Sequence, residues 1–273
     1  MIRSPAVAGS FYPLDKRMLM EQIAGCVNPK ARREAVCGVV VPHAGFSCSG
    51  KVAGAVYSRI EMPDTFVILG PNHSGWGADF SIMTSGVWRM PLGDVRIDSE
   101  LAESILKHSR LLKSDELSHR REHSIEVQVP FMQYFGEGFQ IVPISVRHYL
   151  PMEPYLSACT EVGNAIAEAV KKTKQKVVVV ASTDFTHYES QGTAEKKDKL
   201  ALDAILALDE KRLFKEVLEN EISMCGYGPA AAALTACKKL GCTKAKLVGY
   251  ATSGEVTGDY QHVVGYGGVT IGR

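Results

Sequence analysis

The stretch KVVVVAST, residues 176–183, decides the fold. Four consecutive valines stand between a lysine and a Ser-Thr pair, and this run is too short for a helix of ordinary length. A continuous run of β-branched residues is typical of a strand that is buried on both faces. We therefore expect 176–183 to be a buried strand of a sheet that helices cover on both sides.

The same pattern recurs along the chain and alternates with helical spacing. AVCGVVV (35–41) and TFVILG (65–70) are further buried-strand runs, and GKVAGAVYSRI (50–60) between them has the period of a helix. Strands are also expected at 80–85, 87–97, 139–146, 245–253 and 262–271, and helices at 99–109, 122–135, 154–172, 228–241 and twice within 193–220. This alternation predicts one α/β domain over residues 1–273, with a central mixed or largely parallel sheet flanked by helices.

Composition narrows the class of protein. The 273 residues carry a net charge of +1, which gives no electrostatic reason to expect nucleic acid or a membrane surface as a partner. No apolar run reaches the roughly 18 residues of a membrane span, and no export signal opens the chain. The seven cysteines are odd in number and form no CxxC pair, so we expect free thiols in a cytoplasmic protein.

Polar residues follow three of the expected strands. His43 follows the first buried run, His73 follows the second, and Asp184 with His187 follows KVVVVAST. If these strands are parallel neighbours, their carboxyl ends meet at one edge of the sheet, where ligand sites of α/β proteins gather. A lone histidine at a strand end is usually a turn or packing residue, but three in the same position predict a common site. Imidazole suits zinc, iron and copper.

A metal site of this kind needs a third ligand. Asp184 is one candidate, and Cys225 is another because it precedes an expected helix whose N-terminus would stabilise a thiolate. Cys225 is equally well interpreted as a small buried residue. Cys48 lies five residues from His43 and is a weaker candidate.

The segment REHSIEVQVPF contains a further polar pair. His123 and Glu126 are three residues apart and would share one face of a helix. They are expected either to line the pocket and support the site from behind, or to form a solvated helix face.

Seven motifs together resemble the Memo family, whose archaeal and bacterial members are also called AmmeMemoRadiSam system protein B. The motifs occur in order from end to end of the chain: PAVAGSFYP (5–13), PHAGFSCSG (42–50), LGPNH (69–73), EHSIEVQVPF (122–131), STDFTH (182–187), CGYGP (225–229) and VVGYGG (263–268). Any one of them would be weak evidence, but seven in order are specific.

The resemblance implies a fold like that of the class III extradiol (LigB-like) dioxygenases, which hold non-haem iron with two histidines and a carboxylate. Carried onto this chain, it makes His43, His73 and Cys225 the metal ligands. It places His187 in the acid/base position with Asp184 beside it, and it gives the His123 and Glu126 motif a role in support or pocket lining. A thiolate in place of the carboxylate favours softer metals such as copper(I) and zinc, and it weakens the case for ring cleavage.

Three functions follow as hypotheses. The first is redox or oxygen chemistry at one iron or copper ion, on an unknown small molecule or peptide. The second is a non-catalytic module that binds a peptide or protein in a dioxygenase-like pocket, and the third is a zinc-assisted hydrolase. The family name also implies a functional association with AMMECR-type and radical SAM proteins.

Overall fold

A computed structural model describes residues 1–273 and contains the mixed sheet that the sequence predicts. The nine-stranded sheet has the order β10-β12-β2-β9-β3-β8-β4-β7, and β11 pairs with β12 outside this path. A second sheet of three strands has the order β1-β5-β6. The strands of the large sheet are β2 (Gly38–Val41), β3 (Thr65–Asn72), β4 (Phe80–Ile82), β7 (Lys113–Ser114), β8 (Gln140–Arg147), β9 (Val177–Ser182), β10 (His187–Glu189), β11 (Lys244–Thr252) and β12 (Val263–Gly272). Those of the small sheet are β1 (Ile2–Arg3), β5 (Val87–Met90) and β6 (Gly93–Arg96).

The valine run forms β9 and occupies the centre of the large sheet. It pairs in parallel with β2 on one side and with β3 on the other, and β3 pairs in parallel with β8. Residues 178–182 of β9 are buried, as are β2 and β3 along their whole lengths. The carboxyl ends of β2, β9 and β3 therefore lie side by side, which confirms the parallel arrangement on which the sequence argument depended.

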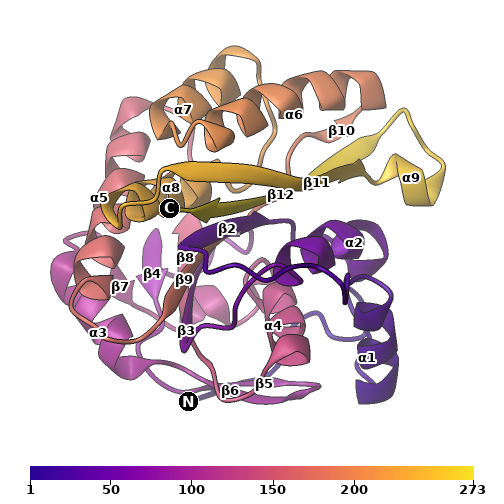
Figure 1. The fold of residues 1–273 in the computed structure, drawn as a ribbon. Coiled ribbons are helices and arrows are strands. Elements are labelled where there is room, and N and C mark those ends of the chain that lie inside the picture. The colour runs from indigo at the N-terminus through magenta and orange to yellow at the C-terminus, as the bar shows by residue number, and fades with distance from the viewer.

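Helices cover both faces of the sheet (Figure 1). The alanine-rich helix α8 packs on β9, β3 and β2, with α5 against it and α3 beyond. Helix α6 continues this layer over β11 and β12, and α7 packs against α6 and α8. On the opposite face α2 packs on β2, β11 and β12, with α1 and α4 against it. The helices are α1 (Lys16–Ala24), α2 (Phe46–Tyr57), α3 (Ser99–His108), α4 (Val129–Phe135), α5 (Glu153–Val170), α6 (Gln191–Leu206), α7 (Glu210–Glu219), α8 (Tyr227–Lys239) and α9 (Gly254–Thr257), with 3₁₀ turns η1 (Leu117–His119) and η2 (Glu126–Gln128).

None of these helices combines the length and the apolar character that crossing a lipid bilayer requires. The helix expected over 122–135 is shorter than predicted. Residues 122–125 form an irregular segment, η2 follows, and α4 begins only at Val129.

The expectation of free thiols is wrong for two of the seven cysteines. Cys37 and Cys242 form a disulfide across a sequence separation of 205 residues. The bond ties the residue before β2 to the turn between α8 and β11. The other five cysteines, including Cys225, are free.

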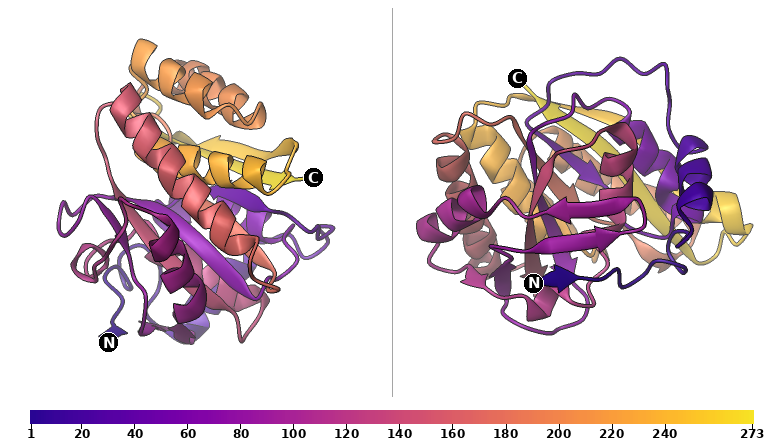
Figure 2. Two further views of the ribbon diagram at one scale, coloured as in Figure 1. Left: turned by 90° about the vertical axis from the view of Figure 1, so that its left-hand side faces the viewer. Right: turned by 90° about the horizontal axis from the view of Figure 1, so that it is seen from below.

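The N-terminal segment crosses the lower end of the molecule, where β1 joins the small sheet (Figure 2). The Arg3 guanidinium lies 4.1 Å from the centre of the Trp88 ring and donates a hydrogen bond of 2.8 Å to the carbonyl of His119. His119 itself is fully buried. Burial, with the neighbouring charge of Arg3, lowers the pKa of His119 to about 3.

We expect His119 to contribute to acid sensitivity. Because the unfolded chain binds a proton at this residue near pH 6.5 and the folded chain only near pH 3, stability falls as the pH drops through that window. The slope from this one group is about 1.4 kcal/mol per pH unit. Urea unfolding between pH 6 and 4 should show a shallower pH dependence for His119→Gln than for the wild type. The same substitution at the exposed His262 should leave the slope unchanged, and equal slopes in all three proteins would contradict the assignment.

Candidate metal centre

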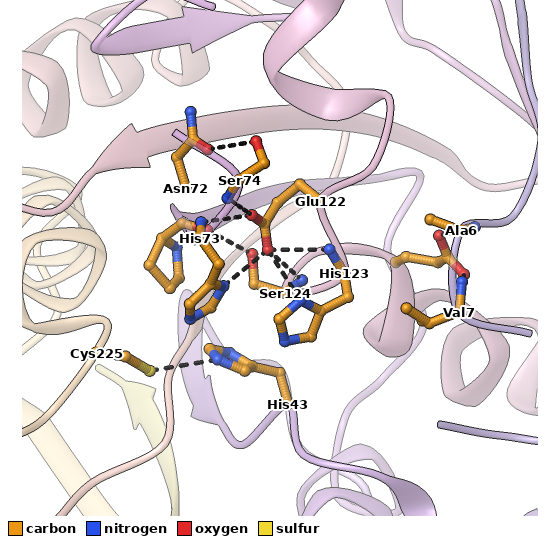
Figure 3. A network of polar contacts seen from close by, with 12 residues as sticks. Ala6, Val7, His43, Asn72, His73, Ser74, Glu122, His123, Ser124 and Cys225 are labelled. Carbon is orange, nitrogen blue, oxygen red and sulfur yellow. Dashed lines mark hydrogen bonds and ion pairs between the residues drawn. The ribbon is translucent and has the colours of Figure 1, made fainter. Parts of the chain in front are cut away.

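Three histidine rings meet beyond the carboxyl ends of β2 and β3. His43 follows β2, His73 follows β3, and His123 comes from the irregular segment before η2. Their rings are turned toward one another, with centres 5.3 Å apart for His43 and His73, 5.5 Å for His43 and His123, and 4.6 Å for His73 and His123 (Figure 3). One ring nitrogen of each lies within 4.8 Å of those of the other two, so the cluster can hold a metal ion.

The carboxylate of Glu122 orients two of these rings. Its Oε1 lies 2.9 Å from Nδ1 of His73 and 3.3 Å from Nδ1 of His123. The same atom accepts the backbone N–H groups of His123 and Ser124, and Oε2 accepts that of His73 at 2.6 Å. Burial alone would raise the pKa of Glu122, but the hydrogen bond and charge of His73 outweigh it and lower this pKa to about 2. An ionised carboxylate only accepts hydrogen bonds, so it fixes Nδ1 of His73 as the protonated nitrogen.

The third ring, His43, is buried and neutral. Burial, followed by the charges of His73 and His123, holds its pKa well below the ordinary value of 6.5. Nδ1 of His43 lies 3.0 Å from the hydroxyl of Ser182 at the end of β9. Nδ1 of each ring in the cluster thus lies against a protein oxygen, which leaves Nε2 as the nitrogen available to a metal.

Cys225 lies beside His43, outside the histidine trio. Its Sγ is 3.3 Å from Nε2 of His43 and accepts the backbone N–H of Asp184 at 3.3 Å. Burial and then the charge of Asp184 raise the pKa of Cys225, so in the metal-free protein this residue is a thiol. That Cys225 completes the ligand set stays a prediction, whereas His123, expected to line or support the pocket, lies within the trio.

Asp184 and His187 occupy the same edge of the sheet but contact different partners. Oδ1 of Asp184 accepts the backbone N–H of His43 at 2.8 Å, and burial raises the pKa of Asp184 to about 6. The ring of His187 is held by Ser223, because Nδ1 of His187 donates to the Ser223 carbonyl at 2.9 Å. Asp184 therefore positions the loop of His43, and Ser223 orients His187.

Glu126 lies away from the cleft and anchors the N-terminal segment. Its carboxylate is fully buried, and it accepts hydrogen bonds from Arg3 at 2.6 Å and from the hydroxyl of Tyr12 at 2.6 Å. The backbone N–H groups of Ala6 and Val7 donate to the same carboxylate. Glu126 therefore does not form a solvated helix face, and its role in the site stays a prediction.

A cleft of about 620 Å³ opens beside the cluster. His73, His187 and Cys225 line its polar side. The apolar wall comes from the end of α7, the segment after it and the loop after β8, and it contains Leu150, Pro151, Val217, Leu218 and Ile222. The lining includes no lysine or arginine, so neither of these side chains is available there to bind a strongly anionic substrate.

The sequence interpretation missed Glu122, Ser182 and Gln128, which hold the histidines from behind. Each is polar and buried. Ser182 and Gln128 stand within or next to apolar runs, and buried polar residues are almost always hydrogen-bonded, so their placement was an available signal. Glu122 follows two arginines and gave no such signal.

Comparison with known families decides the relationship. The model of the family described as "Memo-like protein" matches residues 3–270. The chain belongs to the Memo family. This Memo-family chain is 43% identical to a MEMO1 family protein of Methanopyrus kandleri over 100% of both chains. It is 44% identical to one of Methanothermobacter thermautotrophicus over 97% of this chain and 99% of the relative.

A solved structure supports the fold. An uncharacterized protein from Escherichia coli K12 superimposes with a TM-score of 0.50 over 84% of this chain and 98% of that one, at 10% sequence identity. At this identity the likeness concerns the fold alone.

Proposed function

We propose that this Memo-family protein binds one transition-metal ion at His43, His73 and His123 and carries out redox chemistry on a substrate held in the adjoining cleft. Iron and copper are the metals we favour. The observation that carries the proposal is the trio itself: three rings that each bring a nitrogen within 4.8 Å of the others, while a protein oxygen lies against Nδ1 of each ring.

The donor set fits such an ion. Neutral imidazole is a ligand for zinc, copper and iron, and metal-binding histidines usually donate their second N–H to a carboxylate or another acceptor. Glu122 serves His73 in this way and lies 3.3 Å from Nδ1 of His123, and Ser182 serves His43. When bound, the ion would supply an electron-transfer centre or a Lewis acid.

Cys225 is the alternative third ligand. Its sulfur is next to Nε2 of His43, but burial keeps it protonated, so a metal would have to displace the thiol proton before binding it. A thiolate ligand would shift preference toward copper(I) or zinc, whereas three histidines suit iron, copper and zinc alike.

The remaining residues of the site would transfer protons, position His43 and hold the substrate. We assign His187 as the proton carrier because Ser223 holds its Nδ1 and leaves Nε2 free on the lining of the cleft. Asp184 would keep His43 in place through its bond to the backbone of that residue. The apolar wall would hold the uncharged body of the substrate and exclude water from it.

A metal titration of four proteins tests the ligand set. Wild type purified anaerobically should contain stoichiometric iron, copper or zinc. His43→Ala and His123→Ala should both lose more affinity than the roughly 10–100-fold typical of changes outside the ligand shell. Cys225→Ser should keep the metal if the trio is the site, and should lose it if the thiolate is a ligand. Absence of stoichiometric metal, together with unchanged binding in His43→Ala, would refute the proposal.

The same trio supports a second candidate. Three histidines with an open fourth position form a common catalytic zinc site, in which the ion activates water. Zinc as the resident metal and turnover independent of oxygen would favour this hydrolytic function over the redox one.

A further inference from the structure

Behind His43, away from the cleft, lies a buried chain of hydrogen bonds through Ser182 and Gln128. Both side chains are fully buried. Ser182 ends β9, and Gln128 ends η2. Neither lines the cleft, so their influence on the site passes through the groups that they hold: the ring of His43 and the backbone of Pro42 and Ser124.

Two backbone carbonyls determine which atom is the donor in each of these hydrogen bonds, because a carbonyl can only accept. Nε2 of Gln128 lies 2.9 Å from the carbonyl of Pro42, so this atom is the amide nitrogen and donates there. Its second proton points to Ser182 Oγ at 2.8 Å. The amide oxygen of Gln128 accepts from the hydroxyl of Tyr57 at 3.0 Å, which agrees with this orientation.

Ser182 has one proton, and the second carbonyl takes it. Oγ of Ser182 donates to the carbonyl of Ser124 at 2.6 Å and accepts from Gln128. A hydroxyl has one donor and two acceptor sites, so only an acceptor site remains for His43. Nδ1 of His43, 3.0 Å away, must therefore carry a hydrogen, and Nε2 must be bare.

We propose that Ser182, held by Gln128 and the Ser124 carbonyl, is a positioning residue that locks His43 in the tautomer with a free Nε2 lone pair facing the cluster. The functional role of this tautomer rests on the proposed metal function, but the tautomer itself can be observed in the metal-free protein. Without the lock, the ring would be free to place its proton on Nε2 and donate it to the sulfur of Cys225, 3.3 Å away, which would block the metal-facing nitrogen.

Two measurements on folded protein test the proposal. The first is the ¹⁵N spectrum of histidine-labelled, metal-free protein, in which the two tautomers give different nitrogen shifts. Wild type should show His43 with a protonated Nδ1 and a bare Nε2, identified by the signal missing from His43→Ala. Ser182→Ala should move His43 toward the other tautomer or a mixture. Ser182→Thr, which keeps the hydroxyl, should restore the wild-type shifts.

The second measurement is the Zn²⁺ dissociation constant, obtained by competition with a chromophoric chelator. It should rise about 10–100-fold in Ser182→Ala, as for other residues that orient metal ligands from outside the ligand shell. Ser145→Ala is the matched control, because Ser145 is an equally buried serine of the same sheet whose hydroxyl has no partner. This control should bind Zn²⁺ like the wild type.

The two failures are distinguishable. If the wild-type protein shows the predicted tautomer but binds no metal, the proposed function is wrong, whereas the proposed effect of Ser182 on the tautomer of His43 stands. If the wild-type ¹⁵N spectrum shows His43 protonated on Nε2, the proposed role of Ser182 is wrong. This measurement decides the question even if Ser182→Ala fails to fold. Unchanged tautomer and unchanged Zn²⁺ affinity in a folded Ser182→Ala would also overturn that role.

Discussion

Replacement of Glu126 by glutamine is expected to destabilise the protein by about 3–5 kcal/mol, the range seen when one partner of a buried ion pair is removed. Arg3 and Glu126 are both almost fully buried, and their side chains meet at 2.6 Å. In Glu126→Gln the guanidinium would keep its charge but lose its counter-ion. The amide nitrogen would also face a donor, since every hydrogen-bond partner of this carboxylate donates to it: Arg3, Tyr12, and the backbone of Ala6 and Val7.

The effect should reach the histidine cluster through the N-terminal segment. Phe11 lies in that segment, and its ring centre is 4.8 Å from that of His123. The carbonyl of Phe11 also accepts the N–H of Phe46 at the start of α2. When the anchor at Glu126 is lost, we expect Phe11 to loosen from His123 before the sheet unfolds.

Two measurements separate these effects. Urea unfolding should give a lower midpoint for Glu126→Gln than for the wild type. In the same variant, the rate of hydrogen exchange should increase more at the amides of Ala6 and Val7 than at those of β9. Glu137→Gln is the control, because Glu137 is exposed and makes no side-chain hydrogen bond in the structure. Equal midpoints for Glu126→Gln and Glu137→Gln would show that the buried pair contributes nothing to stability.

The fold was predictable because its signal is local. Valine-rich runs such as 176–183 are typical of strands buried on both faces. The segments between them space their apolar residues with the period of a helix. The parallel order then brings His43, His73 and Asp184 to one edge without further information. For this reason the strand-end residues of the site could be found from sequence.

His123 and Glu122 could not be placed in the same way. They belong to an irregular segment whose path is set by hydrogen bonds to distant residues, such as that from the hydroxyl of Ser124 to the carbonyl of Pro71. Helical spacing predicted a helix there, so the pair considered was His123 with Glu126. In the structure these two side chains lie in different places: His123 belongs to the histidine cluster, and Glu126 binds the N-terminal segment.

The disulfide was also beyond the sequence argument. Cys37 and Cys242 are far apart in the chain, and neither belongs to a spaced cysteine motif. Pairing depends on the meeting of the start of β2 with the turn after α8, which only the assembled sheet determines. An odd cysteine count without an export signal favoured free thiols and gave no information on that contact.

The second large effect is expected for Glu122→Gln, which should weaken metal binding by about 100-fold, the upper end for a residue that orients metal ligands. Glu122 contacts two rings at once: it is hydrogen-bonded to Nδ1 of His73 at 2.9 Å, and it lies 3.3 Å from Nδ1 of His123. An amide has one oxygen, so its nitrogen would face either these ring N–H groups or the backbone N–H groups of His73 and Ser74, which now donate to Oε2. In either orientation a donor meets a donor, and His73 loses its fixed tautomer.

Zn²⁺ affinity should be measured for Glu122→Gln, His123→Ala and the double variant, with Glu137→Gln as the charge-matched control. If Glu122 acts through both rings, the Glu122→Gln effect should shrink but persist in the His123→Ala background, because His73 still depends on the carboxylate. If Cys225 rather than His123 is the third ligand, His123→Ala should be nearly silent and the effect of Glu122→Gln should be undiminished. If Glu122→Gln and Glu137→Gln bind Zn²⁺ with equal affinity, the carboxylate of Glu122 holds the loop but does not orient the histidine rings for metal binding.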